Sequence, residues 1–137
     1  MCLSFPFYQD LRVRFRDVDM MRHVNNAVYL TYLEEGRTGF WEWLFKGNGN
    51  FEKINFIMAK VSINYMAPSF YQDYLRVYLR VKALGDKSFT FQYEIRKRDE
   101  DNLVVNAESV QVMYDYKKGE SYSIPQKMRE IFLEKGQ

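Results

Sequence analysis

Near the start of the chain, apolar residues recur at every second position, and after residue 26 they recur at every third or fourth position. Leu11, Val13 and Phe15 alternate with arginines, which is typical of a strand with one buried face. The next apolar positions recur every three or four residues, as they do along one face of a helix. That face consists of Tyr29, Leu33, Gly36, Phe40 and Leu44. We therefore predict a strand over residues 11–16 and a long helix over residues 27–45.

The predicted helix contains two glycines, Gly36 and Gly39. Each is unfavourable in an isolated helix by about 1 kcal/mol relative to alanine, so their presence indicates that the helix lies tightly against a sheet. The side-chain oxygen of Asn25 or Asn26 can cap the start of the helix. We expect Gly47–Asn50 to end it.

The two-residue period returns after the helix and defines four further strands, joined by turns. We place these strands at residues 60–65, 74–83, 89–96 and 103–116. The inward side chains of the second are Leu75, Val77, Leu79, Val81 and Ala83. The last is apolar on parts of both faces, as a central strand would be. A short helix with Met128, Ile131 and Phe132 on its apolar face follows Pro125.

This order of elements predicts an α+β fold in a single domain over residues 1–137. Consecutive strands joined by short turns form an antiparallel meander, and one long helix can cover one of its faces. The other face and the sheet edges carry tyrosine, arginine and lysine and remain uncovered. We therefore expect a homodimer.

The amino-acid composition limits the classes of binding partner and the cellular compartment that we expect for this protein. The 20 basic and 18 acidic residues give a net charge of +2, which argues against a nucleic-acid partner when no recognition motif accompanies it. Cys2 is the only cysteine, so the sequence offers no internal disulfide and no thiolate pair for a metal, as fits a reducing compartment. No apolar run approaches the roughly 20 residues that span a bilayer, and we identify no signal peptide. We therefore expect a cytoplasmic protein.

The candidate chemistry lies in the polar turn between the first strand and the long helix. This turn holds two carboxylates, Asp17 and Asp19, together with the only histidine, His23, and two asparagines. A helix N-terminus offers unpaired backbone N–H groups and a partial positive charge. A carboxylate and an imidazole beside it can attack a carbonyl while the N–H groups hold the oxyanion. From the residues alone, Asp19 and His23 can also be structural hydrogen-bonding groups of the turn.

The turn and the following helix contain the residues Asp17-Val18-Asp19, His23-Val24-Asn25-Asn26, Tyr29, Tyr32-Leu33-Glu34 and Arg37. This pattern resembles the signature of the hotdog-fold acyl-CoA thioesterases, in particular the 4-hydroxybenzoyl-CoA thioesterase family with its YbgC-like members. The His-Val-Asn-Asn segment is also similar to that of acyl-ACP thioesterases. The resemblance implies a hotdog fold, in which an antiparallel sheet wraps a long helix. It also implies active sites at the interface of a homodimer or homotetramer.

The resemblance further implies roles for the turn residues. Asp19 matches the carboxylate beside the thioester carbonyl, which acts as a nucleophile or as a general base. The backbone N–H of Asn26 matches the oxyanion donor, and Asn25 beside it is a substrate-binding candidate. His23 can hydrogen-bond the thioester oxygen or position water, whereas Asp17 is expected to be structural.

Several positions leave alternatives open. Arg22 stands where many relatives have glycine, so it can narrow the pocket or contact an acyl or phosphate group of the substrate. Met21 stands where acyl-ACP thioesterases carry asparagine, which argues against that activity. On the helix, Glu34 and Arg37 are expected to form an ion pair because they are three residues apart, and a catalytic role for Glu34 or Glu35 is the alternative.

The phosphates of coenzyme A call for cations, and Lys87, Arg96 and Arg98 lie near predicted strand ends where they can bind them. A solvated charged rim is the alternative. The sequence therefore predicts an acyl-CoA thioesterase that requires no metal and no cofactor and releases a carboxylic acid and CoA. The alternatives are an acyl-ACP thioesterase and a noncatalytic acyl-CoA-binding protein of the same fold.

Overall fold

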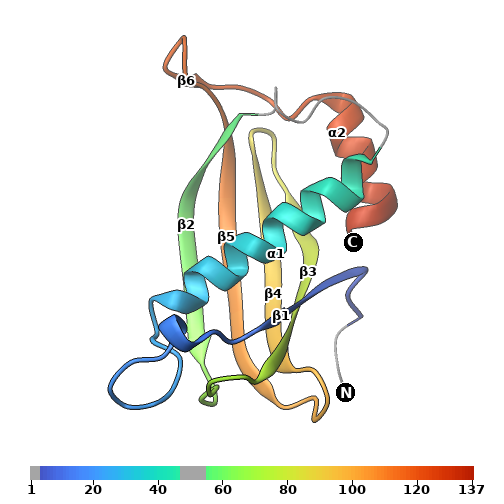
Figure 1. Cartoon of the computed structure of the whole chain (residues 1–137). Helices are drawn as coiled ribbons and strands as arrows, with labels where there is room; N and C mark the ends of the chain where they lie inside the picture. Colours follow the sequence, from blue (N-terminus) through green and yellow to red (C-terminus); the bar gives the residue numbers. More distant parts are fainter. Residues whose placement is uncertain (1–3, 47–54) are drawn as a thin grey trace.

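One long helix lies across an antiparallel sheet in the computed structural model, which describes residues 4–46 and 55–137 (Figure 1). In chain order the elements are β1 (Phe7–Arg12), the 3₁₀ turn η1 (Phe15–Asp17), α1 (Val28–Phe45), β2 (Phe56–Tyr65), β3 (Tyr74–Leu84), β4 (Ser88–Lys97), β5 (Leu103–Asp115), β6 (Glu120–Ser121), α2 (Gln126–Ile131) and the π-helical turn η3 (Phe132–Gly136). The predicted long helix and the four strands after it are confirmed. The segment Gly47–Asn50, expected to end the helix, lies outside the described residues.

The strands follow the order β1-β3-β4-β5-β2, and all neighbouring pairs are antiparallel. β3, β4 and β5 form the predicted meander. The expectation that β2 is the first strand of this meander is wrong, because β2 pairs with β5 at the opposite edge. Residues 66–73 therefore connect β2 to β3 across the end of the sheet, and Pro68, which has no N–H for a strand ladder, lies within this connection. The short strand β6, which was not predicted, pairs with the end of β5.

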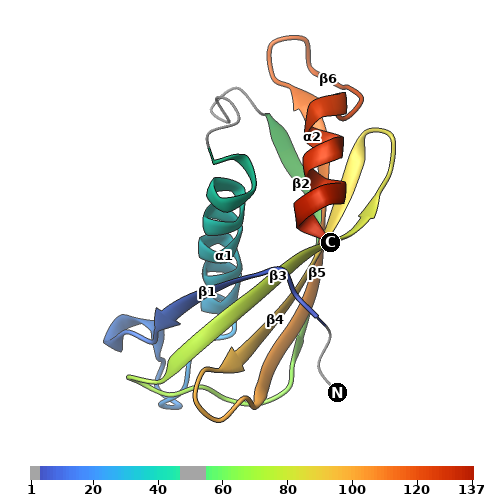
Figure 2. The same ribbon diagram turned by 90° about the vertical axis from the view of Figure 1, so that its right-hand side faces the viewer.

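The helix α1 packs on the inner face of the sheet through the five positions that the sequence predicts, all of which are buried. Figure 2 shows the helix on one side of the sheet. Gly36 approaches β3 so closely that a Cβ atom there would lie 2.8 Å from Val77 Cγ1 and 2.9 Å from Leu79 Cδ1. At Gly39 a Cβ atom would lie 2.5 Å from Gln9 Oε1. Both glycines thus permit the tight packing that offsets their low helix propensity.

Two side chains that were expected to point inward are exposed. The first strand ends before Phe15, which lies in η1 and is 75% exposed. This turn forms because the Asp17 carboxylate accepts a hydrogen bond from the Arg14 N–H, which breaks the extended conformation. Ala83 is exposed because a bulge in β3 directly before it shifts the alternation of the strand.

The C-terminal helix covers the end of the core near the C-terminus of α1 (Figure 1). Met128, Ile131 and Phe132 are buried there, as the sequence predicts, and α2 begins directly after Pro125. In the described part of the chain, no helix combines the length and the apolar character that a membrane span requires.

Candidate active site

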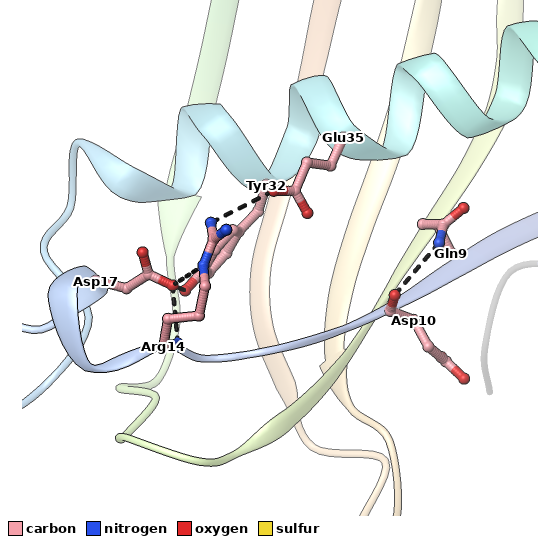
Figure 3. Close-up of polar contacts among 6 residues, drawn as sticks. All are labelled: Gln9, Asp10, Arg14, Asp17, Tyr32 and Glu35. Atoms are coloured by element: carbon pink, nitrogen blue, oxygen red, sulfur yellow. Dashed lines mark hydrogen bonds and ion pairs between the residues drawn. The ribbon is translucent and has the colours of Figure 1, made fainter.

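Asp17 is the structural centre of the polar turn. It is only 4% exposed, and its Oδ2 accepts hydrogen bonds from the Arg14 N–H at 2.9 Å and from the Tyr32 hydroxyl at 2.7 Å (Figure 3). Burial raises the pKa of the Asp17 carboxyl, but these bonds and the charge of Arg14 together hold it below its ordinary value. The Asp17 carbonyl also accepts the Asn25 N–H at 3.0 Å. Asp17 thus connects η1 both to α1, through Tyr32, and to the segment directly before α1, through Asn25. These contacts confirm its expected structural role.

The two helical glutamates are placed differently from the expectation. Arg37 does not pair with Glu34. Instead, its Nη1 donates to the Tyr93 hydroxyl at 3.2 Å, on the inner face of β4. Glu35 lies 3.5 Å from the Arg14 guanidinium, on the side of α1 that faces η1 (Figure 3). The helical spacing identified a possible partner for Arg37, but the packed sheet supplies a different one.

Asp19 begins a tight hairpin that projects from the body of the protein. A bridge between Val18 and Val24 closes this hairpin, and the Asp19 N–H donates to the His23 carbonyl at 3.2 Å. The Asp19 Oδ1 accepts a hydrogen bond from the Met21 N–H at 2.9 Å, so the carboxylate also stabilises the turn of the hairpin. Arg22 has a φ of 70°, in the left-handed region that favours glycine. This geometry explains physically why glycine suits the position at which this chain carries arginine.

A pocket of about 240 Å³ opens beside this hairpin, at the start of α1. Its lining residues are His23, Val24, Asn26, Tyr29, Tyr65, Met66, Ala67 and Pro68. A bridge to Phe70 holds His23, whose Nδ1 lies 3.4 Å from the Val24 carbonyl oxygen. Burial raises the pKa of the Tyr29 hydroxyl, so this wall of the pocket stays neutral. Of the predicted catalytic residues, His23 and Asn26 line the pocket, and Asp19 belongs to the adjoining hairpin.

The backbone N–H of Asn26, just before α1, differs from its neighbours on both sides. Asn25 donates to the Asp17 carbonyl, while the N–H groups of Ala27 and Val28 donate to the Asn25 side-chain and backbone oxygens, each at 2.9 Å. Asn25 therefore caps the turn that leads into the helix. The Asn26 N–H, by contrast, has no acceptor within residues 4–46 and 55–137. A free donor of this kind, at the positive end of a helix, is suited to hold an oxyanion.

Tyr65 is a site residue that the sequence did not reveal. Its hydroxyl donates to the Asn26 carbonyl at 3.1 Å, and its ring lies 5.7 Å from that of Tyr29. The alternation of apolar and polar residues in β2 predicts that Tyr65 lies on the inner face of the sheet, but it does not predict which element Tyr65 contacts. Only the pairing of β2 with β5 brings the end of β2 to the start of α1, so the sequence carried no signal for this contact.

The predicted phosphate-binding cations do not gather at one place. Lys87 lies in the turn between β3 and β4, whereas Arg96 and Arg98 lie at the opposite end of β4. At about 3.3 Å per residue, β4 separates these ends by about 30 Å. The Arg96 guanidinium already donates to Glu94 Oε1 and to the Asp101 carbonyl, both at 2.8 Å. Arg98 contacts Asp99 at 3.2 Å and lies 4.2 Å from the centre of the Tyr74 ring. In the described ranges, no three or more His, Cys, Asp or Glu side chains form a cluster that could hold a metal ion.

Comparison with known proteins places this geometry in a wider group. The sequence model of the "Thioesterase-like superfamily" matches residues 13–132, which is most of the chain. The long-chain acyl-CoA thioesterase FadM of Escherichia coli (strain K12) is 30% identical over 126 residues, which cover 88% of this chain and 92% of that protein.

Solved structures share the fold. A predicted thioesterase from Bacillus stearothermophilus superposes with a TM-score of 0.85 at 22% identity, over 96% of each chain. A thioesterase from Thermus thermophilus, solved with coenzyme A and Zn, gives a TM-score of 0.78 at 28% identity, over 93% of this chain and 92% of that one. These likenesses confirm the expected hotdog arrangement of sheet and helix.

Proposed function

The chain belongs to the thioesterase-like superfamily, and from this premise we propose that it hydrolyses an acyl-coenzyme A to a carboxylic acid and CoA. The free Asn26 N–H carries this proposal, because Asn26 lines a pocket that His23 also lines and that adjoins the Asp19 hairpin. The E. coli relative, by its name a long-chain acyl-CoA thioesterase, and the Thermus structure with bound coenzyme A support this substrate class.

In the proposed reaction Asp19 supplies the reacting carboxylate. Its Oδ1 is held by the Met21 N–H, whereas Oδ2 receives no hydrogen bond from the described residues. Oδ2 can attack the thioester carbon, which expels the CoA thiolate and leaves an anhydride that water then hydrolyses. Alternatively, Oδ2 takes a proton from a water molecule that attacks the same carbon. Both routes consume one water and give the same acid and thiol.

The pocket supplies the remaining groups. As the thioester carbon becomes tetrahedral, its oxygen gains negative charge and accepts the Asn26 N–H. A donor of this kind typically accelerates such a step by about 10²–10³-fold. His23 on the adjacent wall orients the thioester or the water. If its Nδ1 carries the proton and donates to Val24, Nε2 remains an acceptor.

Substrate binding in this proposal uses the same end of the protein. Arg22 projects from the hairpin, is exposed, and makes no ion pair within the described residues, so it is the best-placed cation for a CoA phosphate. Asn25 contributes by fixing the turn that presents the Asn26 N–H. Arg96 is less suited than Arg22, because Glu94 and the Asp101 carbonyl already occupy its guanidinium.

The proposal also includes a second copy of the chain. Among the described residues β2 pairs only with β5, so its outer edge is open over ten residues. Met58, Val61 and Tyr65, on the side of β2 that faces α1, are exposed as well. An open edge and an exposed apolar face are costly for an isolated chain, and pairing with a second β2 would cover both. Tyr65 belongs to the pocket too, so this dimer would place the site at the subunit interface.

The decisive experiment measures thiol release from a panel of acyl-CoA substrates by the purified protein. We expect turnover by the wild type and a loss of at least about 10³-fold in kcat for Asp19→Asn, which keeps the hydrogen bond to the Met21 N–H but removes the charge. Asp99→Asn is the matched control, because Asp99 is an exposed carboxylate in the turn between β4 and β5. Its rate should equal that of the wild type.

Three outcomes would contradict the proposal. Saturable CoA-ester binding without turnover would identify a binding protein. Faster hydrolysis of matched acyl-ACP than of acyl-CoA would identify the protein carrier as the substrate. An unchanged rate in Asp19→Asn would remove Asp19 from the reaction while leaving the activity itself established.

A further inference from the structure

Large apolar side chains are exposed at the end of the protein where α1 begins. We call Phe15, Met20, Met21, Phe70 and Tyr71 the apolar tip. Met20 is 98% exposed, and Met21 is 73% exposed. The rings of Phe15 and Tyr71 meet edge to face at 5.8 Å, and the bridge between His23 and Phe70 joins the two segments of the tip. Figure 1 shows the blue segment before α1, which contains this hairpin, protruding beyond the sheet and α1.

This concentration of exposed apolar surface is unusual for a protein surface. Single exposed apolar side chains are common, but contiguous patches mark sites of interaction. The tip cannot fold back on its own core, because the bridge between Val18 and Val24 fixes the base of the hairpin. The side chains of Met20 and Met21 are therefore available to an external apolar environment.

Cations flank the tip. Arg16 and Arg22 belong to the same segment, are exposed, and make no ion pair within residues 4–46 and 55–137. Of the neighbouring acidic groups, Asp17 is buried against Arg14 and Asp73 pairs with Lys97 at 3.5 Å. Asp19 keeps its charge, and its Oδ1 accepts the Met21 N–H. The acidic turn between β4 and β5 lies away from the hairpin in Figure 1, and Lys97 at its start lies 5.2 Å from the centre of the Phe70 ring.

We propose that the apolar tip docks on an anionic lipid bilayer, with Met20, Met21 and Phe15 in the headgroup boundary and Arg16 on a lipid phosphate. Apolar side chains between cations are the pattern by which proteins bind a membrane surface. A protruding tip suits a lipid surface, into which it can insert, better than a flat protein partner. This docking is a property of the surface and does not depend on the proposed hydrolysis.

The test is sedimentation of the full chain with lipid vesicles in the absence of any acyl-CoA. We expect binding to vesicles of phosphatidylcholine mixed with phosphatidylserine, weaker binding to phosphatidylcholine alone, and a decrease as salt is added. Met20→Glu should weaken binding by about tenfold or more, because it replaces an inserting side chain with a charge that anionic lipid repels. Arg16→Gln should weaken it by about fivefold.

Leu133→Glu is the matched control. Leu133 is 54% exposed in η3, far from the tip, so the same change of chemistry there should leave vesicle binding unchanged. Wild-type protein that binds neither type of vesicle would overturn the proposal, as would Met20→Glu protein that binds like the wild type. A change in the mass of the Met20→Glu protein in solution without lipid would also overturn it, since a second copy would then cover the tip. Thiol release from soluble acyl-CoA tests the proposed function separately.

Discussion

Replacing Tyr32 with phenylalanine would remove the hydroxyl that donates to the buried Asp17 carboxylate at 2.7 Å. A hydrogen bond to a charged group contributes about 1.5–3 kcal/mol, and its loss here leaves a buried carboxylate with fewer donors. We expect the free energy of unfolding at neutral pH to fall by about 2 kcal/mol. With a urea m-value of about 2 kcal/mol/M, the unfolding midpoint moves down by about 1 M.

The effect of this substitution should depend on pH. The folded-state pKa of Asp17 is lowered, so its hydrogen bonds stabilise the fold above the ordinary carboxyl pKa, and this stabilisation is lost as the pH falls through the lowered value. The difference in stability between wild type and Tyr32→Phe is therefore largest near neutral pH and shrinks in acid. Urea titrations of both proteins across this range measure it.

A control separates this bond from the general loss of a tyrosine hydroxyl. Tyr71 is 51% exposed, so Tyr71→Phe should change stability by no more than about 0.5 kcal/mol. If Tyr32→Phe behaves like this control, or if its deficit is the same at every pH, then Asp17 is not the structural centre of the turn.

Three further substitutions test the packing and the turn. Gly36→Ala should destabilise by about 1–3 kcal/mol in thermal or urea unfolding, because its Cβ would contact Val77 Cγ1 at 2.8 Å. Gly39→Ala should cost less, because the shortest contact of its Cβ is with the movable end of the Gln9 side chain, and the Phe7 ring at 3.1 Å needs to shift by only a few tenths of an ångström. Asn25→Ala should cost about 1 kcal/mol through loss of the turn cap and should lower kcat in the thiol-release assay, and an unchanged kcat would separate the cap from the oxyanion donor. Arg22→Gly should raise the unfolding midpoint, because glycine adopts a φ of 70° without strain, while KM for acyl-CoA increases through loss of the cation; an unchanged KM would exclude Arg22 from phosphate binding.

The sequence was most informative where a local pattern decides the structure. The apolar spacing from Tyr29 to Leu44 identified α1 and its buried face, because a helix face follows directly from the 3.6-residue period. The structural role of Asp17 was also predictable. A strand pattern, in contrast, defines which side chains share a face but not which strand lies beside it, so the pairing of β2 with β5 was not predictable.

The parts of the site that the sequence missed depend on contacts between distant segments. Tyr65 reaches the Asn26 carbonyl only because β2 lies at the far sheet edge. Arg37 was assigned to Glu34 from helical spacing, but the hydroxyl of Tyr93 is nearer in the packed structure. Lys87 and Arg96 both lie near strand ends, yet one-dimensional spacing cannot tell that they are opposite ends of β4.

The closed hairpin between Val18 and Val24 makes the turn modular. Its two ends are held by their bridge, and Asp17 fixes the chain outside it, so we expect that residues 20–22 can change in sequence without altering the path of the sheet or of α1. Substitutions in this hairpin can therefore change which acyl group or which surface the protein binds, while the rest of the chain folds as before. Substitutions at residues 20–22 are therefore expected to cost the fold less than substitutions in the sheet or in α1.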